Sequence, residues 1–201
     1  MPCYTFENIT PVIHPTAFVH PSAVLIGDVW IGKNCYIAPL ASLRGDFGRI
    51  RVMDGANVQD CCVLHGFPEH EIRLEENAHI GHGAVIHTAI VRKDALVGIN
   101  AVVLDYAEVG EQAIVAANST VPNSYKVPPR VLFAGSPGQV KRELSAENIA
   151  AKKAGTLTYQ QLAKRSIIGV RETTPLCTDD LQRPTTDWQL PFDASFNLRK
   201  P

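Results

Sequence analysis

Three histidines, His65, His82 and His87, are the side chains of this 201-residue sequence best suited to chemistry. The neutral imidazole ring is a common ligand of zinc and of other divalent metals. A zinc ion with three protein ligands and an open fourth position is a catalytic site rather than a structural one. Scattered histidines are more often surface residues, so the choice depends on whether the fold brings these three together.

A repeat of six residues runs through most of the chain and predicts the elements that position these histidines. The sixth position is always aliphatic in four blocks, namely Ile13, Val19, Leu25, Ile31, Ile37 and Leu43; Val52, Val58 and Leu64; Leu74, Ile80 and Ile86; and Val91, Val97, Val103, Val109, Val115 and Val121. An amphipathic helix repeats at three and four residues and a simple strand at two, so neither explains this period. We expect short strands joined by tight corners, three to a coil of about 18 residues, stacked into a parallel β-helix.

Breaks in the repeat indicate where this regular coil is interrupted. Residues 44–49 and 66–71 are expected to form loops pushed out of the coil, and one residue is deleted between positions 90 and 91. Ser145 is expected to cap a helix that runs to about residue 168, with a possible break at Gly155, before an irregular tail from about residue 171. The chain is therefore predicted to be an all-β protein with a β-helix domain at 1–137 and a C-terminal helix and tail at 138–201.

The phase of the repeat places the histidines in space. His65 and His87 follow the large buried residues of successive coils on the same side, so they stack about 4.8 Å apart and can share one metal. Arg44 has the same phase one coil earlier. His82 follows the large residue of another side, one coil after Asp60, and should not reach the pair within one chain. A three-fold oligomer that sets the His82 side of one subunit against the pair of the next completes three sites.

Composition limits the classes of function. The 19 basic residues are balanced by 20 acidic ones, which gives no electrostatic case for nucleic acid or for an anionic membrane. The start of the chain has no recognisable signal peptide, and no apolar run approaches the roughly 18 residues of a membrane span. Five cysteines with irregular spacing favour a reducing cytoplasm over a disulfide framework. His70 and His79 are expected to be exposed, and His14 and His20 to be structural or solvent-facing.

Four motifs resemble those of the γ-class carbonic anhydrase superfamily of hexapeptide-repeat proteins, namely Arg44-Gly45-Asp46, Asn57-Val58-Gln59-Asp60, Val63-Leu64-His65-Gly66 and Gly81-His82-x4-His87. The resemblance implies a left-handed β-helix and a homotrimer that binds zinc, or another divalent metal such as Fe2+ or Co2+, between subunits. The implied ligands are His65 and His87 of one subunit and His82 of its neighbour. The resemblance also implies that Gln59 orients the bound water and that Asn57 lies near the metal. It further implies that Arg44, Asp46 and Asp60 form an ion-pair network at the subunit interface.

Longer stretches, at residues 18–29 and 41–49, resemble the PaaY/CaiE branch of this superfamily, which contains phenylacetic acid degradation and carnitine operon proteins. Residues 65–69 lean toward PaaY and residues 14–18 toward CaiE. A PaaY-like member implies an acyl-CoA thioesterase, in which zinc-bound hydroxide at the trimer interface hydrolyses CoA thioesters of ring-hydroxylated phenylacetate intermediates. Gln59 is then expected to orient the nucleophile and Glu69 to accept a proton.

Three alternatives to the thioesterase stay open. The first is a γ-type carbonic anhydrase, although Phe47 stands where the archaeal members of that class have an acidic residue. The second is a non-catalytic, CaiE-like accessory protein of carnitine and CoA metabolism. The third is an acyltransferase, because many hexapeptide-repeat proteins transfer acyl groups.

Overall fold

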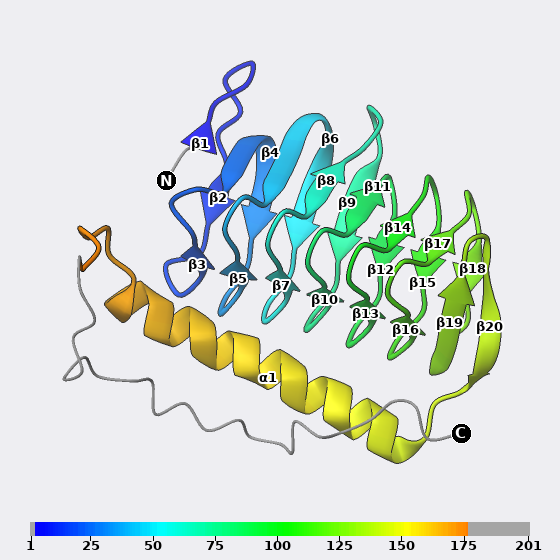
Figure 1. The fold of residues 1–201 in the computed structure, drawn as a ribbon. Coiled ribbons are helices and arrows are strands. Elements are labelled where there is room, and N and C mark those ends of the chain that lie inside the picture. Colours follow the sequence, from blue (N-terminus) through cyan, green and yellow to red (C-terminus); the bar gives the residue numbers. More distant parts are fainter. Residues whose placement is uncertain (1–2, 177–201) are drawn as a thin grey trace.

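The computed structural model describes residues 3–176, which wind into a parallel β-helix with one long α-helix beside it (Figure 1). Each coil pairs in parallel with the coils before and after it, and the large residues of the repeat lie in register. On one side, Leu43 is the partner of Leu64, Leu64 of Ile86, and Ile86 of Val103. The large residues of the predicted six-residue repeat therefore set the register in which the coils stack.

Three sides make up each coil. The helix side consists of β3 (Phe18–Val19), β5 (Tyr36–Ile37), β7 (Asn57–Val58), β10 (His79–Ile80), β13 (Leu96–Val97), β16 (Ile114–Val115) and β19 (Val131–Gly135), with β20 (Gly138–Glu143) at its end. The open side consists of β8 (Val63–His65), β11 (Val85–His87), β14 (Val102–Val103), β17 (Thr120–Val121) and the first halves of β4 (Val24–Ile31) and β6 (Ser42–Val52). The charged side consists of β2 (Val12–Ile13), β9 (Glu71–Leu74), β12 (Ile90–Val91), β15 (Glu108–Val109), β18 (Lys126–Val127) and the second halves of β4 and β6. At the first coil, β1 (Cys3–Tyr4) pairs with β4.

The long strands β4 and β6 turn from the open side onto the charged side without a break. The predicted loop at 44–49 is instead a bulge inside β6, in which residues 46–49 stand opposite the single residue Asp28 of β4. A side chain at Gly27 would place its Cβ 2.5 Å from the carbonyl oxygen of Gly45, and Gly27 has a φ of +70°. The shared bend depends on glycine there. The second break, between β8 and β9, is a loop as predicted.

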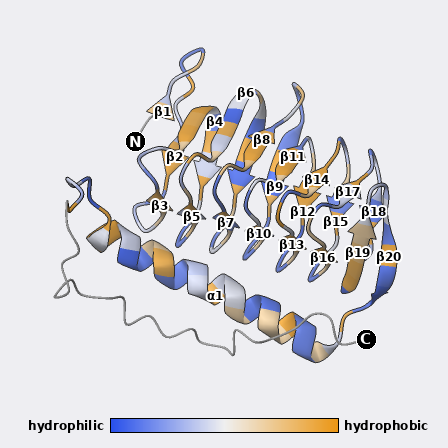
Figure 2. Ribbon diagram, in the orientation of Figure 1, coloured by the Kyte–Doolittle hydropathy of each residue, from blue (hydrophilic) through white to orange (hydrophobic). Residues whose placement is uncertain are grey.

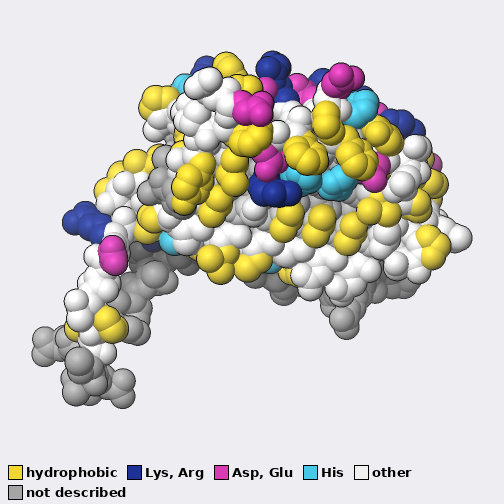
Figure 3. Space-filling model, turned by 90° about the horizontal axis from the view of Figure 1, so that it is seen from above, with side chains coloured by type: hydrophobic (Ala, Val, Ile, Leu, Met, Phe, Trp, Pro, Cys, Tyr) yellow, Lys and Arg dark blue, Asp and Glu magenta, His cyan; other side chains and the backbone are white. Residues whose placement is uncertain are grey.

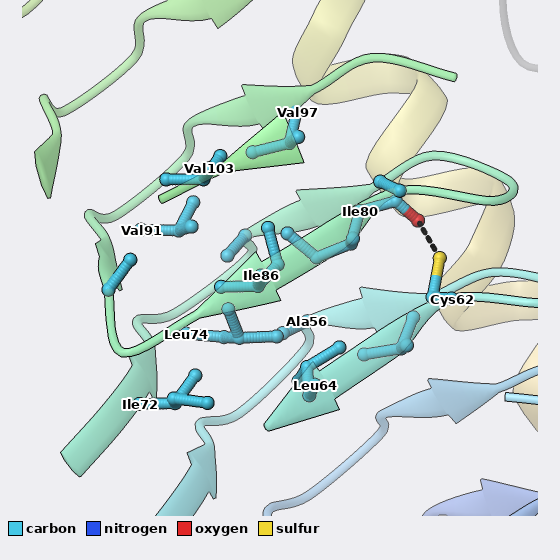
Figure 4. Packing of buried hydrophobic residues seen from close by; sticks show 14 of the residues in the cluster. Ala56, Cys62, Leu64, Ile72, Leu74, Ile80, Ile86, Val91, Val97 and Val103 are labelled. Carbon is cyan, nitrogen blue, oxygen red and sulfur yellow. Dashed lines mark hydrogen bonds between the residues drawn. The ribbon is translucent and has the colours of Figure 1, made fainter. Parts of the chain in front are cut away.

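The interior is an apolar column built from the large residue of each six-residue step. Leu25, Leu43, Leu64 and Ile86 have no exposed surface, and the equivalent residues on the other sides are buried except Ile13 and Val19 of the first coil, which are partly buried. Small residues, among them Ala23, Ala84 and Cys62, are also buried in this column. Figure 4 shows Leu64, Ile80 and Ile86 from neighbouring strands directed toward one another. Stacking thus buries apolar surface that no single coil could bury.

Polar and apolar residues alternate along the strands (Figure 2). The outward residues differ from one side of the coil to the next. The charged side carries ion pairs, among them Arg73 with Glu71 at 2.6 Å and Lys126 with Glu108 at 3.3 Å. The first outward position of each open-side strand is uncharged and small or β-branched, namely Val24, Ser42, Val63, Val85, Val102 and Thr120. This row of residues carries no charged side chain.

Helix α1 (Ala146–Gly169) covers the helix side and packs against β3, β5 and β7. Ser145 caps it, as predicted, by accepting a hydrogen bond from the Asn148 backbone N–H. The helix continues through Gly155, so the possible break there does not occur. Its buried face is polar: Lys152 Nζ donates to the carbonyl oxygen of Asn77 at 2.7 Å, and Thr156 and Ser166 are also buried. Hydrogen bonds therefore position this helix as much as apolar contact does.

The expected domain boundary at residue 137 falls inside a hairpin. The strands β19 and β20 pair antiparallel, from Val131 with Glu143 to Gly135 with Gly138. The sheet thus extends to Glu143, and the helical segment begins only after it. The expected tail lies partly outside the described residues, which end at Leu176. Within the described residues, no helix is both long enough and apolar enough to cross a membrane.

His79 corrects another expectation, because it lies partly buried beneath α1 rather than exposed. Its Nε2 is 2.6 Å from Gln59 Nε2, its Nδ1 is 3.5 Å from Thr156 Oγ1, and its ring meets Tyr159 edge-on. Burial, reinforced by the charge of Lys152, lowers the pKa of His79 to about 3. The repeat alone did not show which side the helix covers, so the burial of His79 was not visible in the sequence.

The neutral state of His79 predicts how acid weakens the fold. The unfolded chain protonates this ring below its usual pKa of 6.5, whereas the folded protein resists until about pH 3. Stability is therefore lost as pH falls through this window, by about 1.4 kcal/mol per pH unit. Urea unfolding at pH 6.5 and 4.5 should show a drop about 2 kcal/mol smaller in His79→Gln than in the wild type. His70→Gln, an exposed control, should keep the wild-type slope, and equal slopes in all three proteins would contradict this account.

Candidate metal centre

The strands β8 and β11 place His65 and His87 side by side. They are direct partners in the parallel register, and each follows a buried aliphatic residue, so both side chains point outward. Their ring centroids are 5.4 Å apart, and His65 Nδ1 lies 3.4 Å from His87 Nε2. Two nitrogens bound to one tetrahedral zinc at 2.0–2.1 Å lie about 3.3–3.4 Å apart. The spacing of the pair therefore matches that of two ligands on one ion.

A carboxylate lies near the second nitrogen of each ring. Asp105 Oδ1 accepts a hydrogen bond from His87 Nδ1, whereas Asp46 Oδ1 lies 3.2 Å from His65 Nε2 without a hydrogen bond between them. Metal-binding histidines usually have such a partner, which fixes the ring and makes the free nitrogen a better donor to the metal. Burial and the charge of Arg44 lower the pKa of His65, which keeps its ring neutral and able to bind a cation.

His82 occupies a different corner, between the helix side and the open side. It follows β10, and its Nδ1 lies 2.6 Å from Asp60 Oδ2, so this ring has a carboxylate partner as well. Both side chains are nearly half exposed. In the described part of one chain, no cluster of three or more His, Cys, Asp or Glu side chains could hold a metal. As the phase of the repeat predicts, one subunit brings His65 and His87 together and leaves His82 apart.

Gln59 and Asn57 lie on the helix side rather than beside the histidine pair. Both are buried beneath α1, and Gln59 Nε2 donates to Asn57 Oδ1 at 3.0 Å. Asn57 Nδ2 is buried without a hydrogen-bond partner in the described chain. These residues thus share a side of the coil with Asp60 and His82. The role of Gln59 in orienting water stays a prediction.

The loop between β8 and β9 adds aromatic rings to the site. Phe67 meets His87 edge-on at 5.1 Å, and Phe47 of β6 lies 5.2 Å from His65, measured between ring centroids. Both phenylalanines are largely exposed. Glu69 is exposed at a φ of +64°, and among the described residues it makes no hydrogen bond or ion pair. Its role as proton acceptor also stays a prediction.

The remaining residues of the expected network lie near the pair. Arg44 Nη1 is 3.4 Å from Asp46 Oδ2, and the Arg44 side chain is 45% exposed and so free to reach a second subunit. Figure 3 shows histidine side chains side by side on one face, among acidic, basic and hydrophobic ones. Sequence reasoning missed Asp105, although it lies 18 residues, one coil, after His87.

Known proteins share both the sequence pattern and the fold. Residues 10–45 match the family model described as bacterial transferase hexapeptide (six repeats). The carnitine operon protein CaiE of Proteus sp. (strain LE138) is 49% identical over 92% of this chain and 93% of its own. CaiE of Escherichia coli (strain K12 / DH10B) is 48% identical over 93% and 97%. The structure of a hexapeptide transferase family protein from Anaplasma phagocytophilum has a TM-score of 0.78 and 31% identity, and the match covers 81% of this chain and 96% of that one.

Proposed function

The chain belongs to the CaiE family of hexapeptide-repeat proteins, and from this premise we propose that it is a CaiE-like accessory protein of carnitine and CoA metabolism. The observation that carries the proposal is identity of 48–49% over more than nine-tenths of both chains. A match of this extent includes the loop and the helix as well as the repeats. The carnitine setting of these relatives favours this alternative over a phenylacetate-pathway thioesterase.

A homotrimer is the second part of the proposal, and the open side supports it. The row of outward residues Val24, Ser42, Val63, Val85, Val102 and Thr120 is uncharged, and Val63 is 38% exposed. The two corners that flank this side carry the His65–His87 pair and His82, respectively. Packing the open sides around a three-fold axis buries this surface and sets each pair against the neighbour's His82.

A divalent metal at each of these interfaces is the third part, and the residues present fit it. The pair has the spacing of two zinc ligands, and all three histidines have a carboxylate at one ring nitrogen. That leaves the other nitrogen of each ring for the ion, which is zinc or another divalent metal such as Fe2+ or Co2+. When bound, such an ion supplies a Lewis acid with an open position.

Hydrolysis of a CoA thioester is the second candidate, favoured by that open position and by the apolar rim of Phe47 and Phe67. Carbon dioxide hydration is less well supported. The carbonic anhydrase resemblance implies an acidic residue where Phe47 stands, and the Phe47 ring lies against His65. Acyl transfer has the family description in its favour, whereas no described residue identifies an acceptor site.

Mixed trimers test the metal site between subunits. His82→Ala and His87→Ala homotrimers should each bind no zinc, because every interface lacks one ligand. A hybrid trimer of the two variants keeps one complete interface, which pairs the His82→Ala subunit's His65 and His87 with the other variant's His82. Random mixing should therefore restore about one quarter of the wild-type zinc content. His20→Ala, whose ring Nδ1 lies 2.8 Å from Ser22 Oγ, is the control and should bind normally. Zinc bound by monomers, or none restored in hybrids, would contradict the arrangement.

The accessory role is separated from hydrolysis by two assays on the zinc-loaded trimer. The trimer should raise the rate of a carnitine CoA-transferase several-fold, and alone it should release no thiol from CoA thioesters of carnitine or phenylacetate. Thiol release by the trimer alone, lost in His87→Ala, would instead establish the thioesterase. A trimer inactive in both assays would refute both readings.

A further inference from the structure

Asp105 lies at the corner that follows β14, one coil beyond His87. Its Oδ1 accepts the hydrogen bond from His87 Nδ1, and the two side chains are 19% and 27% exposed, respectively. Among the described residues, the Asp105 carboxylate contacts no lysine or arginine and has no other hydrogen-bond partner. Within the described residues, His87 is therefore the one hydrogen-bond partner of this carboxylate.

The contact with Asp105 determines which nitrogen of the His87 ring carries the proton. A neutral imidazole carries one proton, and a carboxylate at Nδ1 holds it there. The lone pair is then on Nε2, the atom that faces His65 Nδ1 at 3.4 Å. Thr88 Oγ1 is 3.4 Å from the same Nδ1, but it already accepts a hydrogen bond from the Phe67 backbone N–H at 3.0 Å. Asp105 is thus the one strong acceptor at that nitrogen.

The carboxylates beside the other two histidines, His65 and His82, are either shared with another group or more exposed to solvent. Asp46 lies 3.2 Å from His65 Nε2 but also contacts Arg44 at 3.4 Å. Asp60, beside His82, is 43% exposed. The contact between His87 and Asp105 is better buried than that of His82, is not shared with an arginine, and belongs to the pair that one subunit must preform before a neighbour arrives.

We propose that Asp105 is a positioning residue for the metal centre, which selects Nε2 of His87 as the ligating atom and holds its ring toward His65. The inference rests on the metal site of the proposed function. Asp105 lies on the far side of the ring from Nε2, so it acts through His87 and does not bind the ion itself. Removing such a partner typically weakens metal binding about 10–100-fold.

The test measures zinc affinity of the full-length trimer by competition with a chelator. Asp105→Ala should bind zinc about 10–100-fold more weakly than the wild type. Asp105→Asn should fall between the two, because its amide oxygen can accept the same hydrogen bond without the charge. Asp54→Ala is the matched control, since Asp54 is a corner carboxylate that accepts from the Lys33 backbone N–H at 2.8 Å and touches no histidine. Its zinc affinity should equal that of the wild type.

Visible absorption of the cobalt-loaded proteins supplies a readout that a loss of general stability does not move. The tetrahedral cobalt bands should change in Asp105→Ala while the protein remains a trimer, and Asp105→Asn should restore most of the wild-type spectrum. Wild-type affinity and an unchanged spectrum in Asp105→Ala would overturn the inference and leave the metal site standing. Equal losses in both variants would also overturn it, by making Asp105 a ligand. A wild-type trimer without metal affinity would refute the proposed site and this inference together.

Discussion

The direct stacking of one coil on the next governs the rest of this structure. Parallel strands keep successive coils about 4.8 Å apart, and side chains alternate between the column and the outside. Once Leu64 and Ile86 are partners inside the column, His65 and His87 must be partners outside it. The chemistry of the surface is thus fixed by the packing of the interior. A shift of one residue in either strand would turn a histidine inward and an aliphatic side chain out.

The three sides of the coil share one apolar column but differ in what covers their outer surfaces. The charged side compensates its own charges in ion pairs such as Arg73–Glu71, and α1 shields the helix side. Beneath that helix lie groups that rarely stay buried, among them His79 and Lys152. Burial lowers the pKa of Lys152 to about 7, which measures how unfavourable its charge is there. The open side has no helix over it, and the uncharged outward residues along its strands suit a second copy of the chain.

In the proposed metal site, the strands of one subunit already set the histidine pair side by side. The distance between His65 Nδ1 and His87 Nε2 matches that of two ligands on one tetrahedral ion, and Asp105 accepts a hydrogen bond from the His87 ring. Ligands presented by strands lose little freedom when an ion binds, which favours affinity. The carnitine operon proteins of Proteus sp. and Escherichia coli match more than nine-tenths of this chain, including the strands that carry the histidine pair.

The sequence by itself determined the period, the column and the phase of each histidine, because a six-residue repeat admits one regular stacking. It therefore predicted that His65 and His87 share a side and that His82 does not. Only the tertiary structure decided that β6 absorbs residues 44–49, that α1 covers His79, and that Asp105 reaches His87. The physical reason is that these features depend on contacts between segments that do not share the six-residue period. The repeat fixes how the coils stack, but it does not fix which side the helix covers or which way a single side chain points.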